Sequence, residues 1–398
     1  MREVVFVDAA RSAFANMGGG LKKLYPSEIG GFVIRELAKR NNIYDNGKLD
    51  AVFAGSAMGD RVPDPARYAA LAAGLPVETE AHFIEMQCGS GIAAINHAAA
   101  FIATGNADVV IAGGMESYSQ IMAYFRMDTE PYKLIPPAAI DRRHCPDDEE
   151  NIDMIRVSEK MAKIWGVSRA ECDEFALQSQ QRMTEAYKKG VTGPEIVPYV
   201  IPATKKTPEV VIDKDEYPRP NTTIEGLSGL RPVYEGGVTT AGNASGRNDG
   251  AAFVLMLSAD RAKELGFKPY ARWIAGADIG CAPSIMGIGP AYSNIKAMQR
   301  AGLSLDDIDV IECNEAFASQ NLGVIKEMEK QLGKKIDRSR WNPNGGAIAI
   351  GHPNGASGAR IAWFAMKQLE YSGRRYGLFG ACIGGGQGAS AVIENLRI

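Results

Sequence analysis

The sequence predicts an α/β protein whose two similar halves pack together as layers, with a loop-rich segment inserted in the first half. Three observations support this prediction: apolar stretches with strand and helix patterns that alternate, repeats that relate the two ends of the chain, and a polar segment that the repeats do not cover. Strands and helices that alternate along a chain usually form layers around one sheet.

The N-terminal part contains two predicted strands and a predicted helix. The stretches "EVVFVDAA" at 3–10 and "ADVVIAGG" at 107–114 are apolar and rich in β-branched residues, which is typical of buried strands. Between them, "SGIAAINHAAAFIATG" at 90–105 is apolar on nearly every side. A helix with this composition is buried rather than amphipathic.

Internal repeats relate the two ends of the chain. "SGIAAINHA", which starts at Ser90, resembles "SGARIAWFA", which starts at Ser357. Matches that recur in the same order indicate a duplication. Two further pairs follow this order: "IAGGMES" at 111–117 with "LFGACIG" at 378–384, and "LDAVFAGSAM" at 49–58 with "IDVIECNEAF" at 308–317.

Residues 118–240 have no counterpart in the duplication. They carry charge runs, a helix-like stretch that begins at Ser168, and a polar segment with prolines. Long insertions in α/β enzymes commonly cover or bind the substrate. We therefore expect an inserted loop domain over one face, with one half formed by 1–117 and 241–270 and the other by 271–398.

Composition and charge exclude several classes of partner. The net charge of −3 provides no overall field that would recruit nucleic acid or an anionic membrane, and no uncharged apolar window approaches ~18 residues. The six cysteines form no C-x-x-C pair, and they complete no metal-ligand spacing with the four histidines. We expect a cytoplasmic protein with reduced thiols and no signal peptide.

Cys88 immediately precedes the predicted buried helix. The start of a helix offers unpaired N–H groups and partial positive charge, and both stabilise a thiolate. Gly89 and Gly91 remove side chains next to the sulfur, so that a substrate can approach. The alternative is a buried structural cysteine, which is a common role for free thiols.

His352 stands just ahead of the second copy of this helix, in "NPNGGAIAIGHPNGASGAR" at 342–360. A histidine is the usual partner that activates a thiol. The glycines of this stretch fit a loop where backbone and substrate pass closely. The alternative is a turn histidine without a role.

Two further polar stretches end predicted strands. In "GACIGGGQGAS" at 380–390, Cys382 and Gly384 lie in a run whose backbone N–H groups can face an oxyanion. No phosphate-loop motif accompanies these glycines, so nucleotide binding is discounted. In "NEAFA" at 314–318, Asn314 either fixes a water or a carbonyl, or caps a helix.

These motifs give the sequence its resemblance to the thiolases, which are acyltransferases that act on coenzyme A (CoA) esters. The matching pieces run in family order over nearly the whole chain. They are "CGSG" at 88, "GGMES" at 113, "AGNASGRNDGAA" at 241, "MGIGP" at 286, "NEAFA" at 314, "GGAIAIGHPNGASGAR" at 345 and "CIGGGQG" at 382.

The resemblance implies a role for each matching residue. Cys88 would carry the acyl group as a thioester, His352 would activate it, and Cys382 would move a proton at C2 of the acetyl group. Asn314 would hold a water in a first oxyanion hole with His352, and the N–H groups of Cys88 and Gly384 would form a second one. The resemblance also matches two residues with positions that contact CoA: Arg219 and Ser245.

Acetyl-CoA C-acetyltransferase is the activity that the resemblance favours, with acetoacetyl-CoA as the default substrate. The alternative is a thiolase for longer or functionalised 3-ketoacyl-CoA esters. A decarboxylating condensing enzyme would need a second site histidine, and a non-catalytic acyl-CoA-binding homologue would have lost a reactive residue. The resemblance further implies a homodimer or homotetramer in which CoA is a substrate or product, without a tightly bound cofactor.

Two acidic residues depart from the family pattern. Many thiolases have asparagine three residues before the nucleophile, where this chain has Glu85, and Asp153 stands in a stretch that often begins with histidine. If Asp153 borders the acyl pocket, its charge disfavours long alkyl chains, because they would be buried beside a carboxylate. This premise predicts a preference for short or polar acyl groups.

Overall fold

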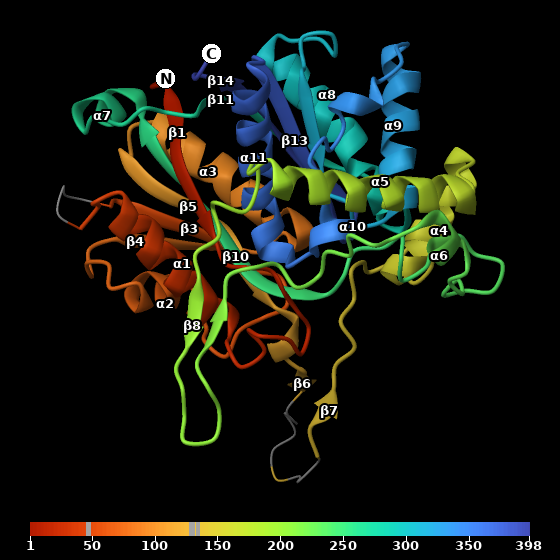
Figure 1. Ribbon diagram of the computed structural model, residues 1–398, viewed down its shortest axis with the longest axis horizontal. Helices are drawn as coiled ribbons and strands as arrows, with labels where there is room; N and C mark the ends of the chain where they lie inside the picture. The colour runs from red at the N-terminus through yellow and green to blue at the C-terminus, as the bar shows by residue number, and fades with distance from the viewer. Residues whose placement is uncertain (45–48, 127–131, 133–135) are drawn as a thin grey trace.

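One mixed sheet runs through the molecule in the computed structural model, which describes residues 1–44, 49–126, 132 and 136–398 (Figure 1). The strands follow the order β12-β13-β14-β11-β1-β10-β5-β3-β4, and the short β2 pairs with β10. Their bounds are β1 Val4–Arg11, β2 Ala15–Asn16, β3 Ala51–Gly55, β4 Glu80–Ile84, β5 Val109–Ser117, β10 Asn248–Ser258, β11 Ala271–Gly280, β12 Val310–Cys313, β13 Tyr376–Ile383 and β14 Gln387–Asn395.

The sheet has an approximate two-fold relation between its halves. Strands β3 and β5 are parallel, as are β12 and β13, and β5 pairs antiparallel with β10 as β13 does with β14. The two central strands, β1 and β11, join the halves antiparallel from Val4↔Trp273 to Phe6↔Ala271. This arrangement confirms the α/β fold with two similar halves that the repeats predict.

The main helices form three layers around the two halves of the sheet. Helices α3 and α11 contact each other and share one apolar core with strands of both halves. The pair α1 and α2 covers a second core in the first half, and α8 and α9 cover a third in the second half. Their bounds are α1 Pro26–Arg40, α2 Pro65–Ala72, α3 Ser90–Ala103, α7 Ala259–Glu264, α8 Gly289–Ala301, α9 Ala318–Leu332, α10 Ala347–Ile350 and α11 Asn354–Ser372.

The two central helices meet through their backbones. Gly91 of α3 and Gly358 of α11 follow the serines that start the two repeats. A Cβ atom on Gly91 would lie 2.6 Å from the carbonyl oxygen of Gly355, and one on Gly358 would meet the backbone of Gly91. Glycine is therefore required on both helices for this close approach.

The segment between β5 and β10 carries its own elements. Ser168 caps α5, because its side chain accepts a hydrogen bond from the N–H of Glu171, whose carboxylate in turn accepts one from the N–H of Ser168. Arg11 of β1 anchors the segment from the body, since its guanidinium is buried against Glu195 and Asp215 at 2.8 and 2.7 Å. The elements are β6 Phe125–Arg126, β7 Ala138–Ala139, α4 Met154–Trp165, α5 Arg169–Lys188, β8 Tyr199–Ile201, β9 Val210–Ile212 and α6 Ile224–Ser228.

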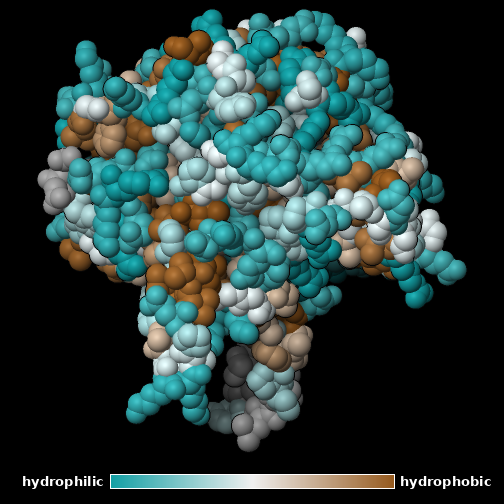
Figure 2. All heavy atoms as spheres, viewed as in Figure 1, coloured by the Kyte–Doolittle hydropathy of each residue, from teal (hydrophilic) through white to brown (hydrophobic). Residues whose placement is uncertain are grey.

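Two arms project from the body in the same direction: the β8–β9 hairpin and the segment around β6 and β7 (Figure 1). Apolar side chains gather where the hairpin leaves the body (Figure 2), and Val200 and Val211 are among those that are exposed. None of the helices in the described ranges combines the length and the apolar composition needed to cross a bilayer.

Candidate functional site

A cavity of about 460 Å³ opens where the two central helices begin. Cys88 lies two residues before α3, and His352 lies two residues before α11. Both residues line the cavity, so the helix pair brings together two positions that are far apart in the sequence. The wall also includes Met58, Gln87, Tyr118, Ile121, His144, Met154, Ile155, Val233, Thr239, Thr240, Ala241, Ala244, Ser245, Gly246, Arg247, Met286, Ala316, Phe317, Asn354 and Gly384.

The backbone directly before Cys88 adopts a conformation that non-glycine residues rarely take. Gln87 has φ +46°, in the left-handed region. The carboxylate of Glu85 holds this residue, because Oε1 accepts hydrogen bonds from the backbone N–H and from the side-chain amide of Gln87, both at 2.9 Å. Strained residues of this kind cluster at functional sites.

The thiol of Cys88 is protonated in the resting site. Burial, together with the nearby carboxylates of Glu116 and Glu85, raises its pKa to about 12. Hydrogen bonding from the N–H groups of Gly384 and of Cys88 itself lowers the pKa. These two N–H groups therefore face the sulfur. There they can also stabilise negative charge on the oxygen of a group that is bonded to the sulfur.

The imidazole of His352 is held in one tautomer. Its Nδ1 lies 2.6 Å from Oγ of Ser357, whose hydroxyl donates to the carbonyl oxygen of Pro353 at 3.1 Å. Because the hydroxyl proton is engaged there, Nδ1–H must be the donor toward Ser357. The other ring nitrogen, Nε2, is left as an acceptor. Burial, together with the charge of Arg360, lowers the pKa of His352 to about 3, so that the ring is neutral at physiological pH.

Asn314 lies at the end of β12 and reaches the same imidazole. Its Nδ2 is 3.3 Å from Nε2 of His352, while its Oδ1 accepts a hydrogen bond from the buried guanidinium of Arg360 at 3.3 Å. Arg360 thereby fixes the orientation of the amide. Asn314 is not a helix cap, because α9 begins only after Phe317.

Cys382 lies near the end of β13 and is fully buried. Burial raises its pKa well above the usual value, and its interaction with Cys88 raises it further. Gly384 belongs to the turn between β13 and β14 and lines the cavity, while Cys382 does not appear in the described wall. The second thiol thus lies close to the first, behind the cavity surface.

Comparison with known proteins assigns this arrangement to a family. The sequence profile described as the thiolase N-terminal domain matches residues 4–260, and that of the thiolase C-terminal domain matches residues 267–395. The chain belongs to the thiolase family. The match confirms the resemblance that the motifs indicate.

Several individual thiolases are similar to this protein over nearly its whole length. A β-ketoadipyl-CoA thiolase of Acinetobacter baylyi is 42% identical over the full length of both proteins. An acetyl-CoA acetyltransferase of Chromobacterium violaceum is 40% identical over 98% of this chain and 99% of the relative. The crystal structure of the acetyl-CoA acetyltransferase of Bacillus anthracis superposes with a TM-score of 0.90 at 37% identity and covers 99% of each chain.

The two residues that the thiolase resemblance connects with CoA lie in different pockets. Ser245 lines the cavity with Cys88, and its N–H donates to the carbonyl oxygen of Ala316 at 3.0 Å. Arg219 instead lines a neighbouring pocket of about 220 Å³, where its guanidinium lies over the ring of Tyr217. Ala241 lines both pockets, so the two are neighbours.

The premise that Asp153 borders the acyl pocket is wrong. Asp153 caps α4: its Oδ1 accepts hydrogen bonds from the N–H groups of Ile155 and Arg156, and its Oδ2 accepts one from the hydroxyl of Tyr234 at 2.9 Å. The apolar side chains of Met154 and Ile155 line the cavity in its place. A helix start attracts a carboxylate to its own N–H groups, which accounts for the difference.

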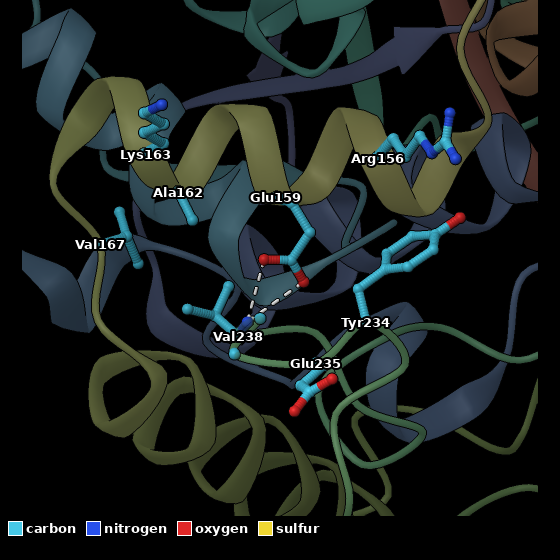
Figure 3. A pocket seen from close by; sticks show the side chains of 10 residues that line it. Arg156, Glu159, Ala162, Lys163, Val167, Tyr234, Glu235 and Val238 are labelled. Atoms are coloured by element: carbon cyan, nitrogen blue, oxygen red, sulfur yellow. Dashed lines mark hydrogen bonds between the residues drawn. The ribbon is translucent and has the colours of Figure 1, made fainter.

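A separate surface pocket of about 490 Å³ lies along α4 (Figure 3). It contains none of the predicted site residues. Glu159 accepts hydrogen bonds there from the N–H groups of Val238 and Thr239. Because Thr239 lines the cavity with Cys88, this contact fixes one wall of the site from outside.

Sequence reasoning missed several cavity residues. Tyr118, His144 and Arg247 line the wall. His144 shows that a second histidine does reach the cavity, although no motif indicates it. Glu116 lies behind the wall and accepts four hydrogen bonds, which join the loop after β3 to the start of α11; the donors are the hydroxyl of Ser56 and the N–H groups of Ala57, Met58 and Gly355.

Proposed function

We propose that this thiolase transfers acyl groups to and from CoA by Claisen condensation and thiolysis, through an acyl-Cys88 intermediate. The observation that carries the proposal is the convergence of Cys88, His352 and the Gly384 N–H on one cavity. A thioester intermediate splits one difficult condensation into two easier steps.

In the first step, the sulfur of Cys88 attacks the carbonyl carbon of an acyl-CoA while Nε2 of His352 takes the thiol proton. The pKa values of about 12 and about 3 mean that both groups are neutral at rest, so this proton moves only as the attack proceeds. The bond between the acyl carbon and the CoA sulfur breaks, and CoA leaves with the proton. The Gly384 and Cys88 N–H groups stabilise the negative charge that develops on the carbonyl oxygen.

In the second step, the thiol proton of Cys382 passes to Nε2 of His352, which the departure of CoA has left free, and the Cys382 thiolate removes a proton from C2 of acetyl-CoA. The resulting enolate oxygen needs donors, and Nε2 of His352 becomes one once it is protonated. Nε2 lies 3.3 Å from the amide nitrogen of Asn314, and a water held by Asn314 would be the second donor of this oxyanion hole. The enolate carbon attacks the acyl carbon, the bond to Cys88 breaks, and the leaving Cys88 sulfur takes the proton from Nε2 of His352, so that both groups are neutral again.

Acetoacetyl-CoA is the default product, as for the acetyl-CoA acetyltransferases that this chain resembles. A second candidate is a thiolase for a functionalised 3-ketoacyl-CoA, which the similarity to β-ketoadipyl-CoA thiolases favours. Ser245, in the cavity, and Arg219, in the neighbouring pocket, would contact CoA. Residues 118–240 would cover it, since Tyr118, His144 and Val233 lie in the wall.

Radiolabelled acetyl-CoA tests this function directly. We expect label on Cys88 in the wild-type protein and none in Cys88→Ala, which should fold normally because the lost thiol is small. A Cys145→Ala variant is the matched control and should retain label, since Cys145 lies outside the cavity wall. Turnover of Cys88→Ala at a tenth of the wild-type rate would contradict the assignment of the nucleophile.

We also propose that the protein is a homodimer or homotetramer in the cytoplasm. The exposed apolar side chains of the projecting arms support the oligomer, because isolated apolar patches favour association (Figure 2). All six cysteines are free thiols, which supports a reducing compartment. Sedimentation equilibrium gives the number of subunits, and a monomer at micromolar concentration would contradict the oligomer.

A further inference from the structure

The described part of the cavity wall carries one permanent positive charge and no negative charge. Among its described residues, Arg247 is the only arginine or lysine, and none is an aspartate or glutamate. Most of the remainder is apolar or neutral: Met58, Ile121, Met154, Ile155, Val233 and Met286 form the apolar part. Arg247 is exposed to solvent, and a cation that no other residue of the described wall neutralises favours an anionic ligand.

No carboxylate of the described chain is paired with Arg247. Its guanidinium has neither an ion pair nor a hydrogen bond to any described residue. The buried carboxylates of Glu116 and Asp249 already accept hydrogen bonds from neutral donors. Glu116 accepts its four hydrogen bonds from N–H and O–H groups, and Asp249 accepts from the N–H of Ser119 at 2.9 Å and from its hydroxyl.

Arg247 lies beside the reacting groups. Its backbone forms an isolated bridge with that of His352. Burial raises the pKa of the Tyr118 hydroxyl, as does the nearby Cys88, while the charge of Arg247 lowers it. Tyr118 therefore lies within electrostatic reach of both the guanidinium and the nucleophile.

We infer that Arg247 binds a carboxylate carried by the acyl group, so that carboxylated 3-ketoacyl-CoA esters are the preferred substrates. The inference rests on the proposed thiolase reaction and favours its second candidate substrate, a functionalised 3-ketoacyl-CoA, over acetoacetyl-CoA. The phosphates of CoA are separated from the thioester by the length of the pantetheine arm, whereas the acyl group is bonded to the reacting carbon. An anion that reaches a residue beside His352 therefore belongs to the acyl group. A guanidinium suits this ligand, because its donors match both oxygens of a carboxylate.

Two substrates of equal length test the inference. The first is 3-ketoadipyl-CoA, which ends in a carboxylate, and the second is 3-ketohexanoyl-CoA, which ends in a methyl group. We expect the wild-type enzyme to have the higher kcat/KM for the first. Arg247→Gln should lower kcat/KM for 3-ketoadipyl-CoA by about 10- to 100-fold, as expected for a lost charge-assisted hydrogen bond, and for the methyl-ended ester by less than about 3-fold.

Two control variants make the comparison specific. Arg247→Lys keeps the charge and should recover part of the preference. Arg143→Gln removes an exposed arginine that pairs with Asp148 outside the cavity wall, and it should change neither substrate. A loss of equal size on both substrates would place Arg247 against the pantetheine arm and overturn the inference, as would no loss on either.

A competition experiment needs no variant. Wild-type protein is mixed with equal amounts of succinyl-CoA and butyryl-CoA, and mass spectrometry identifies the adduct on Cys88. Succinyl-Cys88 in excess supports the inference, and butyryl-Cys88 in excess overturns it while leaving the proposed function intact. Failure of every CoA ester, acetyl-CoA included, to acylate Cys88 would instead overturn the proposed function.

Discussion

Nδ1 of His352 lies 2.6 Å from Oγ of Ser357, one turn into α11. The hydroxyl of Ser357 is itself bound to the carbonyl of Pro353, so the chain of hydrogen bonds determines which ring nitrogen carries the proton. The serine thus makes Nε2 the base without touching the substrate.

Replacement of Ser357 by alanine should lower kcat by about 10-fold or more and change KM little, because the imidazole loses the partner that fixes its tautomer. Steady-state kinetics with acetoacetyl-CoA and CoA measure both constants. The rate of Cys88 alkylation by iodoacetamide at fixed pH should fall in parallel, because the same base assists both reactions. An unchanged kcat would show that the tautomer is fixed without Ser357.

Cys382→Ser should separate the two half-reactions. Acylation of Cys88 by acetyl-CoA should survive, since His352 activates this thiol. Condensation should fall by orders of magnitude, because a serine hydroxyl is a much weaker acid than a thiol and relays a proton poorly. Rapid-quench labelling measures acylation, and acetoacetyl-CoA formation measures condensation. Equal losses in both assays would argue that Cys382 has another role.

Glu85→Gln should lower the pKa of Cys88, because it removes a carboxylate that raises it, while the amide oxygen can still accept the hydrogen bonds from Gln87. The alkylation rate with iodoacetamide at pH 8 should rise about 2- to 5-fold, as expected for an exposed charge worth under about 1 kcal/mol. Glu78→Gln is the matched control: it removes an exposed carboxylate that has no part in the Cys88 pKa. A rate that rises equally in both variants would count against a local effect.

The buried neutral histidine should make folding stability depend on pH. The pKa of His352 is about 3 in the folded protein and about 6.5 in the unfolded chain, so between these values only the unfolded chain binds the proton. Stability is therefore lost as pH falls below 6.5, at up to about 1.4 kcal/mol per pH unit.

Urea unfolding of the wild-type protein and of His352→Asn at pH 7 and pH 5 measures this effect. Asparagine retains a donor toward Ser357 but does not titrate. The loss of unfolding free energy between the two pH values should be about 2 kcal/mol smaller in the variant, at equal protein concentration. Parallel losses in the two proteins would show that His352 is protonated in the folded state.

The regular parts of the molecule follow from the sequence, whereas the walls of the site do not. The buried pattern of 90–105 predicts α3, which spans Ser90–Ala103, and the repeat predicts that Cys88 and His352 precede equivalent helices. Helix starts and strand ends can be located because their neighbours have periodic apolar patterns.

The cavity residues Tyr118, His144 and Arg247 lie in or beside the inserted segment, where the sequence has no periodic apolar pattern. Their proximity to Cys88 depends on long-range contacts, such as the buried pairing of Arg11 with Glu195 and Asp215, which no local pattern encodes. The misplacement of Asp153 has the same origin. A carboxylate beside an apolar stretch is compatible both with a pocket wall and with a helix cap, and only the fold distinguishes the two.

The contact between Gly91 and Gly358 has an evolutionary consequence. The two glycines occupy equivalent positions of the repeat and touch on the approximate two-fold axis of the sheet, so the halves are related like the subunits of a symmetric dimer. In an ancestral homodimer every mutation would enter both copies, and the two helices would begin with identical side chains. Fusion into one chain removed this restriction. One helix start then acquired a thiol and the other an imidazole. Two chemically different groups thus evolved beside what had been a two-fold symmetry axis.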